Sequence, residues 1–371
     1  MNINPFLVSG YLDPLYFCDR EKESERLMSV IKNQRHLTIF SLRRMGKTGL
    51  IKHVFYQIAK DKGILPIYLD IMPTSDFSEF TSSFAKAVFS ALAKRESTVK
   101  KLLIALSSLR PTLTYDSITG SPEISIKVDN HTEAVQSIEV IFQYLEKQKL
   151  HIVIAIDEFQ QISNYPEQSV EAELRKNIQQ TPNVTFIFSG SRKHILSEMF
   201  SNSNRPFFNS TEIMEIGKID AEVYKSFISD HFNSGGKKID SNALNMIEQV
   251  TFMHTFFVQY ICNRLYSENL KKIGVEDVNK IYNSILIENE PVFSNYINLL
   301  TAFQLRLLRA IARNSDNLGI TSKEFLSKNN LGAASSVNTA IKSLLDKEFI
   351  YFEDGRYYLL ERFFSGWLAK P

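Results

Sequence analysis

The sequence predicts an α/β fold in which a parallel sheet is flanked by helices, followed by a helical domain and a C-terminal winged-helix domain. Three observations predict this order. Short apolar runs alternate with longer amphipathic segments over the first half of the chain, which is the pattern of parallel βαβ units with right-handed crossovers. From about residue 216 the pattern becomes helical. The last part of the chain combines three helical runs with a hairpin signal.

The chain of 371 residues is too long for one ordinary core, so we divide it into three domains. The predicted α/β domain covers residues 1–215, the helical domain 216–290 and the winged helix 291–371. Within the first domain, residues 97–132 are rich in Pro, Gly, Ser and Thr and interrupt the alternation of strands and helices. We interpret this segment as an insertion that forms a hairpin or a surface loop.

The composition excludes several classes of protein. Hydrophobic residues make up 44% of the chain and charged residues 23%, which is typical of a folded globular protein, and a net charge of +2 does not favour wholesale nucleic-acid binding. The two cysteines, Cys18 and Cys262, cannot form a disulfide framework, and no C-x-x-C spacing suggests zinc. The sequence has neither an apolar run long enough to span a membrane nor a signal-peptide pattern, so we expect no membrane contact and a cytoplasmic location.

Four strands of the fully buried kind are predicted in the first domain, because apolar and β-branched residues run together there and a loop follows each run. They cover residues 37–42, 64–72, 151–159 and 184–191. Apolar residues at helical spacing predict helices within segments 48–63 and 77–94. The first of these helices ends near Lys62-Gly63, where a glycine suits a helix C-terminus.

The rest of the chain is predicted to be largely helical. Helical runs cover residues 221–232, 240–251, 256–270, 302–313, 322–329 and 335–347. The aromatic-rich segment 348–360 follows, and the Asp354-Gly355 pair in its middle is a strong signal for a tight hairpin turn. Three helices and a β-hairpin make up a winged helix.

Residues 41–48, SLRRMGKT, nearly match the phosphate-binding pattern G-x-x-x-x-G-K-[ST], with Ser41 in place of the first glycine. The segment follows a predicted strand and opens a predicted helix, which is the context that a P-loop requires. Gly46 would let the backbone approach a phosphate, Lys47 would reach the β- and γ-phosphates, and Thr48 would hold Mg²⁺. Serine at the first position removes no N–H donor. The predicted nucleotide-binding residues are Ser41, Arg43, Arg44, Met45, Gly46, Lys47, Thr48 and Gly49.

The predicted strand 151–159 carries Asp157 and Glu158 near its carboxyl end, as a Walker B strand does. Asp157 would hold the Mg²⁺ water shell, and Glu158 would polarise the attacking water. An acidic pair that simply ends a core strand is the alternative. Because the pair lies about 110 residues after a P-loop, we favour the Walker B interpretation. The predicted metal ligands are Thr48 and Asp157.

These motifs resemble the AAA+/STAND class of P-loop ATPases, in particular its archaeal-type ATPase group, over essentially the whole chain. The resemblance rests on YFCDREKESERL, RRMGKT, AIDEFQQI, FIFSGSR and LDKEFIYFEDGRYYLLERFFSGWL, in this order. It implies an ATPase that binds ATP or ADP with Mg²⁺, hydrolyses ATP slowly and acts as a nucleotide-dependent switch. It also implies that the first motif lies beside the adenine, and it is compatible with a nucleotide-dependent homo-oligomer.

The resemblance also assigns roles to individual residues. Lys47, Asp157 and Glu158 would be catalytic, and Arg192, directly after the predicted strand 184–191, matches the arginine that senses the γ-phosphate in STAND proteins. A surface arginine in a loop is the alternative interpretation of Arg192. Arg205 could act on a neighbour's nucleotide, but we favour a solvated loop charge.

The predicted helical lid departs from the family at residues 251–257, TFMHTFF, where a Gly-x-Pro-like turn is usual. Thr255 stands at the proline position, so the coupling of the lid to the nucleotide is open, whereas nucleotide binding is not affected. His254 could contact a phosphate, but a histidine between aromatic residues is more often packed in a core.

The winged helix leaves the choice of partner open between DNA and protein. The outward face of its recognition helix carries one lysine among hydroxyls and an amide, whereas a phosphate-tracking surface usually gathers several Lys or Arg. The residues of this outward face are Ser335, Ser336, Asn338, Thr339 and Lys342. Three hypotheses follow: a nucleotide switch, a DNA-associated ATPase and a non-hydrolysing scaffold. Glu158 argues against the third, because a scaffold needs no water-activating carboxylate.

Overall fold

The structure of the protein is a computed structural model that describes residues 3–95, 103–104, 106–115, 120, 122–314 and 319–370. The chain forms two compact units. The first is Gly10–Gly217, and the second joins the residues before Gly10 to Lys218–Pro371. The chain therefore passes between the units twice, after Ser9 and after Gly217. The predicted insertion 97–132 lies partly outside the described residues.

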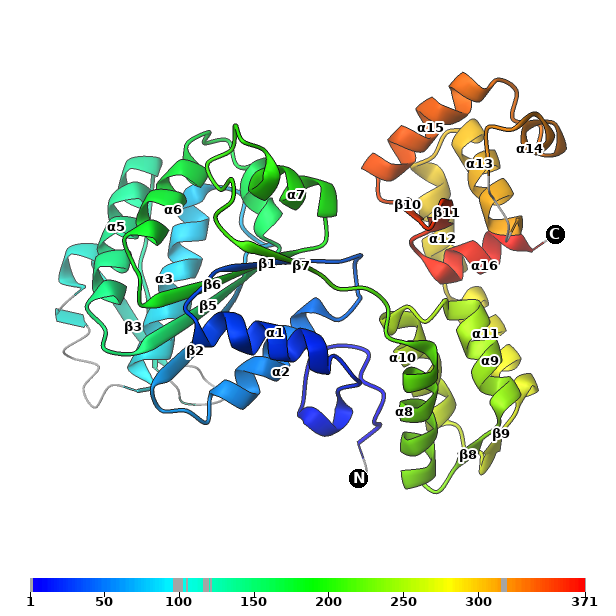
Figure 1. The fold of residues 1–371 in the computed structure, drawn as a ribbon, viewed down its shortest axis with the longest axis horizontal. Helices are drawn as coiled ribbons and strands as arrows, with labels where there is room; N and C mark the ends of the chain where they lie inside the picture. Colours follow the sequence, from blue (N-terminus) through cyan, green and yellow to red (C-terminus); the bar gives the residue numbers. More distant parts are fainter. Residues whose placement is uncertain are drawn as a thin grey trace. The chain divides into compact units, whose positions relative to one another are not determined.

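A five-stranded parallel sheet forms the centre of the first unit, with strand order β2-β5-β6-β1-β7 (Figure 1). The strands are β1 (Leu37–Phe40), β2 (Ile64–Asp70), β5 (His151–Asp157), β6 (Val184–Gly190) and β7 (Glu212–Glu215). The parallel sheet confirms the predicted fold class. Strand β7 was not predicted from the sequence; it has four residues, lies at the edge of the sheet, and only its Met214 is buried.

Helices cover both faces of this sheet (Figure 1). The helices of the unit are α1 (Glu21–Lys32), α2 (Lys47–Ile58), α3 (Phe77–Ala93), α5 (His131–Glu146), α6 (Val170–Gln179) and α7 (Lys193–Ser201). Alternate residues of β5 enter two separate cores, as the period-two geometry of a strand requires. Ile154 packs in a core with residues of α3, α5, α6 and α7, whereas Val153 packs in a core with residues of α1 and α2.

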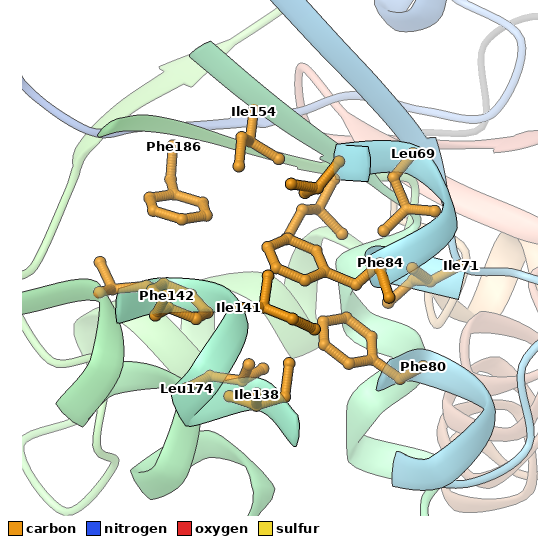
Figure 2. Close-up of a cluster of buried hydrophobic side chains, with 14 of the residues drawn as sticks. Leu69, Ile71, Phe80, Phe84, Ile138, Ile141, Phe142, Ile154, Leu174 and Phe186 are labelled. Atoms are coloured by element: carbon orange, nitrogen blue, oxygen red, sulfur yellow. The ribbon is translucent and has the colours of Figure 1, made fainter. Parts of the chain in front are cut away.

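Phenylalanine rings connect the elements of the larger core (Figure 2). The rings of Phe80 and Phe84 on α3 stack with centroids 5.8 Å apart, Phe84 stacks on Phe142 of α5 at 5.6 Å, and Phe142 stacks on Phe186 of β6 at 5.8 Å. Such rings contribute large buried apolar areas. This core packs against β5 and β6 and holds their carboxyl ends in place. The acidic pair lies at the carboxyl end of β5.

The described part of the predicted insertion contains a short hairpin. Strand β3 (Thr112–Tyr115) pairs antiparallel with β4 (Pro122–Ser125), after the 3-10 turn η2 (Ser107–Leu109). Ile124 is fully buried in the larger core and its N–H donates to Ser90 Oγ of α3 at 3.4 Å. The hairpin is therefore attached to α3 through packing as well as through the chain.

Helices dominate the second unit, with two parallel two-residue strands among them. Its first part consists of α8 (Ala221–Ser234), β8 (Lys238–Ile239), α9 (Ser241–Thr251), α10 (Thr255–Ser267), β9 (Lys272–Ile273), α11 (Val275–Glu288) and α12 (Glu290–Asn298). Residues before Gly10 pack into it: Phe6 is fully buried, its ring centroid lies 5.0 Å from that of Phe232, and Asn263 Nδ2 donates to the Phe6 carbonyl at 2.7 Å.

The winged helix completes the second unit. It consists of α13 (Ala302–Arg313), α14 (Lys323–Lys328), α15 (Ala334–Asp346), β10 (Ile350–Glu353), β11 (Arg356–Leu359) and α16 (Arg362–Ala369). Strands β10 and β11 pair antiparallel, and both turn residues, Asp354 and Gly355, have positive φ values of 49° and 78°. This is the turn that an Asp-Gly pair favours, so the predicted hairpin is confirmed. In the described part of the chain, no helix combines the length and apolar character needed to cross a membrane.

Candidate functional site

The loop between β1 and α2 has the form of a phosphate cradle. It runs from Ser41 to Gly46, and α2 begins at Lys47. The backbone N–H groups of the first helical turn and the helix dipole favour an anion at this place. The positive φ values of the loop fall at Arg44 (61°) and Gly46 (96°), and Ser41 is not among the described residues with a positive φ. Serine therefore replaces the first glycine without backbone strain.

Lys47 is almost fully buried and its ammonium points back into the loop. Its Nζ lies 3.1 Å from Ser41 Oγ and 3.5 Å from the Leu42 carbonyl oxygen, to both of which it donates. The serine at the first position thus supplies an acceptor for the lysine that a glycine could not supply.

Three hydroxyl groups converge on the Asp157 carboxylate at the end of β5. Thr48 Oγ1 and Tyr68 OH donate to Asp157 Oδ2 at 2.6 and 2.7 Å, and Ser189 Oγ donates to Oδ1. Burial alone would raise the pKa of Asp157, but these hydrogen bonds, together with the positive charge of Lys47, lower it below its ordinary value. The structure thus brings Thr48 and Asp157 together and keeps the carboxylate ionised.

Glu158 follows in the left-handed region, with φ of 56°. Its Oε2 accepts hydrogen bonds from Gln160 Nε2 and, at 3.1 Å, from Ser191 Oγ. A Cβ atom on Gly190 would lie 1.8 Å from Gln160 Oε1, so glycine at this position makes room for the Gln160 side chain. The segment from Ser189 to Ser191 therefore contacts both carboxylates of the acidic pair.

These residues fit a divalent cation beside a phosphate. Mg²⁺ prefers oxygen ligands, and the Thr48 hydroxyl and the Asp157 carboxylate lie in direct contact at the first turn of α2, where the phosphate cradle ends. Asp70, at the end of the neighbouring strand β2, pairs in register with Asp157. Burial, followed by the charges of Asp157 and Glu158, raises the pKa of Asp70. The carboxyl ends of β2 and β5 therefore concentrate negative charge that a cation would neutralise.

Five residues of the site were missed by the sequence analysis. Tyr68, Ser189, Ser191 and Gln160 contact the acidic pair, and Arg20 contacts the phosphate-binding loop. The two serines were visible as FSGS at the end of β6, which pairs with β5, the predicted Walker B strand. No signal in the residues around Tyr68 predicts its contact with Asp157, because the pairing of β2 with β5 depends on the order of strands in the whole sheet.

The two arginines considered in the sequence analysis have different surroundings. Arg192 is the residue before α7 and follows β6 by two positions. Its role as a γ-phosphate sensor stays a prediction. Arg205 forms an ion pair with Glu171 of its own chain, and its Nε donates to Glu171 Oε2 at 3.2 Å. Arg205 is therefore partly buried and paired within its own chain rather than solvated, and its action on a neighbour's nucleotide is not tested.

The lid turn lies in the second unit. Phe252 and Met253 have φ values of 53° and 54°, so two consecutive non-glycine residues are left-handed where the family usually has a glycine-containing turn. Thr255 is the first residue of α10. The buried His254 ring lies 4.8 Å from the Phe257 ring, which supports the packed interpretation of this histidine.

Comparison with known proteins agrees with this geometry. Residues 17–251 match the model of a family described as an ATPase domain predominantly from Archaea, and residues 291–370 match a family described as a probable winged helix domain. A search of curated proteins found no match.

Solved structures share the fold at low sequence identity. The Walker-type ATPase PABY2304 of Pyrococcus abyssi is 16% identical with a TM-score of 0.65, over 99% of this chain and 100% of that chain. The ORC2 protein of Aeropyrum pernix, in ADPNP–ADP complexes, is 13% identical with a TM-score of 0.58, over 99% and 95% of the two chains. Cdc6p of Pyrobaculum aerophilum is 12% identical with a TM-score of 0.52, over 99% and 98%.

Proposed function

Because the chain belongs to the family of ATPase domains found predominantly in Archaea, we propose that it is a molecular switch that binds Mg-ATP and hydrolyses it slowly. The observation that carries the proposal is the 2.6 Å hydrogen bond from Thr48 Oγ1 to Asp157 Oδ2, which joins the phosphate-binding loop to the Walker B strand. The ORC2 structural relative was solved in complexes with ADPNP and ADP, which supports nucleotide binding.

The residues of the loop bind the phosphates. The N–H groups of the first turn of α2 face the β-phosphate, and Lys47 exchanges its contacts with Ser41 and Leu42 for the β- and γ-phosphate oxygens. Thr48 and Asp157 would hold Mg²⁺, which would supply positive charge to neutralise the phosphates. Tyr68 and Ser189 keep the Asp157 carboxylate oriented by their hydrogen bonds.

Glu158 orients the attacking water and accepts its hydrogen bond. Gln160 and Ser191 both donate to Oε2 of this carboxylate, so Oε1 can accept the hydrogen bond of the water while both donors stay in place. Arg192, at the start of α7, is the candidate for contact with the γ-phosphate.

The segment before α1 is the candidate adenine site. The Phe17 ring stacks on His53 of α2 with centroids 4.2 Å apart, and Tyr11 OH lies 3.1 Å from His53 Nδ1. A Cβ on Gly49 would lie 3.6 Å from Phe17, so the ring covers the first turn of the helix that follows the phosphate cradle. A flat aromatic surface beside this cradle suits a purine base.

The winged helix serves the switch rather than DNA in this proposal. The exposed residues on α15 include a single cation, Lys342, whereas DNA-binding surfaces gather several. The hairpin is tied within its own unit: Glu353 forms an ion pair with Lys218, and the Tyr358 and Phe252 rings lie 5.7 Å apart. Because the wing contacts Phe252, a change in the lid turn can act on the wing. We therefore rank a DNA-associated ATPase as the second candidate function.

Calorimetric titration with Mg-ATP tests the site. We expect wild-type protein to bind, and Lys47→Ala to bind roughly 100-fold more weakly while its circular dichroism stays unchanged, because charge-assisted hydrogen bonds to the phosphates are lost. Lys60→Ala is the matched control, since Lys60 lies beyond the end of α2 and its ammonium lies over the Tyr56 ring. Equal affinity of Lys47→Ala and wild type would exclude the P-loop assignment.

A further inference from the structure

We propose that Arg20 is a positioning residue that couples the phosphate-binding loop to the point where the chain leaves the first unit. The proposal rests on the nucleotide site proposed above and adds to it a residue that lies outside both nucleotide-binding motifs.

One guanidinium joins three segments that are distant in sequence. Arg20 immediately precedes α1, has a φ of 77° and is 5% exposed. Its Nη1 donates to Glu23 Oε1 at 2.9 Å. Its Nη2 donates to the Gly217 carbonyl oxygen at 2.7 Å and to the Met45 carbonyl oxygen at 3.4 Å. The same nitrogen therefore contacts the phosphate-binding loop and the last residue of the first unit.

The contact with Met45 acts on the phosphate cradle because a peptide group is planar and trans. The Met45 carbonyl and the Gly46 N–H belong to one peptide group, so they point in opposite directions. When Arg20 holds the carbonyl, it fixes the direction of the Gly46 N–H, the donor directly before Lys47 at the start of α2. Arg20 thereby orients a donor of the phosphate cradle without touching a phosphate itself.

The contact with Gly217 acts on the crossing, the point after Gly217 where the chain passes into the second unit. A side chain built at Gly217 would meet no described atom within 4 Å, and the same holds at Gly10, which has a φ of 79° and opens the first unit after the other crossing. Ile216 N–H still donates to the Phe40 carbonyl at 2.9 Å, so β1 holds the chain up to that residue. At Gly217 the chain is held instead by the hydrogen bond from the Arg20 guanidinium to the carbonyl oxygen.

Phosphate binding therefore has a physical route to the crossing. Any rotation of the Met45–Gly46 peptide on phosphate binding changes one acceptor of Arg20 Nη2, and the strength of its bond to the other acceptor, Gly217, changes with it. A buried guanidinium that only satisfied carbonyl groups would stabilise the fold but would not respond to ligand. The difference between these two roles is measurable.

Hydrogen exchange of the full chain, with and without saturating ADP, separates the two roles. In wild type we expect ADP to slow exchange in the phosphate-binding loop and also at residues 217–221. In Arg20→Met, which keeps an unbranched apolar stem, we expect saturating ADP to protect the loop but not the crossing, and ADP affinity to fall about tenfold. Glu23→Gln is the matched control, because it weakens the contact of Nη1 and leaves both Nη2 contacts in place. It should behave as wild type.

Several outcomes would overturn the coupling. One is full protection of the crossing in Arg20→Met, and another is wild-type protein in which ADP protects the loop alone. If Arg20→Met does not fold, Arg20→Lys replaces it, since one ammonium cannot reproduce the planar fork of the guanidinium. Full wild-type protection in Arg20→Lys would then count against the proposal. If ADP slows exchange neither in the loop nor at the crossing of wild type, the proposed nucleotide site is wrong as well. Failure of the coupling and failure of the nucleotide site are therefore distinguishable.

Discussion

At the scale of single residues, the chemistry of the site concentrates on Asp157. Burial raises the pKa of this carboxyl, and three hydroxyl donors with a nearby ammonium reverse the effect. Asp157 therefore stays ionised in a place where an isolated carboxyl would tend to take up a proton. An ionised carboxylate is what a Mg²⁺ site requires, and the protein maintains it with neutral hydroxyl groups as well as with the charge of Lys47.

This arrangement predicts a pH dependence of stability. Because the pKa of Asp157 in the folded protein lies below its ordinary value of 3.8, its stabilisation is complete at neutral pH and is lost as the pH falls from that value toward the lowered one. Ser189→Ala removes one donor and raises this pKa toward the ordinary value, so we expect the loss to become smaller and to end at a higher pH. We also expect the free energy of unfolding at pH 7 to fall by about 1–2 kcal/mol.

Urea unfolding measured across the acidic range checks this expectation. Ser191→Ala is the control, because its hydroxyl donates to Glu158 and not to Asp157. An identical pH profile for both variants would contradict the assignment of the Ser189 hydroxyl to Asp157.

At the scale of elements, the winged helix and the lid turn meet around a buried cation. Arg362, the first residue of α16, is 8% exposed and its guanidinium lies 3.7 Å from the centre of the Phe252 ring. Burial lowers the pKa of Arg362, and its Nε has no hydrogen-bond partner among the described residues. The cation–π contact offsets part of this cost. It also holds the strained lid turn against the winged helix, where the family usually has a glycine-containing turn.

The residues before Gly10 also connect distant parts of the chain, because Phe6 packs between α8 and α10 of the second unit. Phe6 is fully buried among the rings of Phe227, His231, Phe232 and Tyr266. We expect Phe6→Ala to destabilise the second unit by about 3–5 kcal/mol, because it removes a large buried side chain and leaves a cavity. Hydrogen exchange of α8 and α10 measures the effect. Ile3→Ala, at a residue that is 57% exposed, should change stability by less than about 0.5 kcal/mol. Equal effects of the two substitutions would mean that Phe6 does not anchor the segment.

At the scale of the whole molecule, the sequence pattern predicted what depends on local physics. Buried strands, the P-loop after β1, the acidic pair at the end of β5 and the Asp-Gly hairpin all have signals within a few residues. Contacts between distant segments carried no such signal: Tyr68 reaches Asp157 because β2 pairs with β5, and Arg20 reaches Gly217 across 197 positions. The edge strand β7 escaped because four residues with one buried side chain show no clear period.

Single-turnover and steady-state ATP hydrolysis by wild type and Glu158→Gln test whether Glu158 activates water at a nucleotide site. Glutamine keeps the size and the hydrogen-bonding capacity of the side chain but loses the charge that polarises water. We expect both proteins to bind Mg-ATP with similar affinity, wild type to turn over slowly, and hydrolysis by Glu158→Gln to fall by at least about 100-fold. Equal turnover by the two proteins would exclude Glu158 as the water-activating residue, and no binding of Mg-ATP by wild type would exclude the nucleotide site.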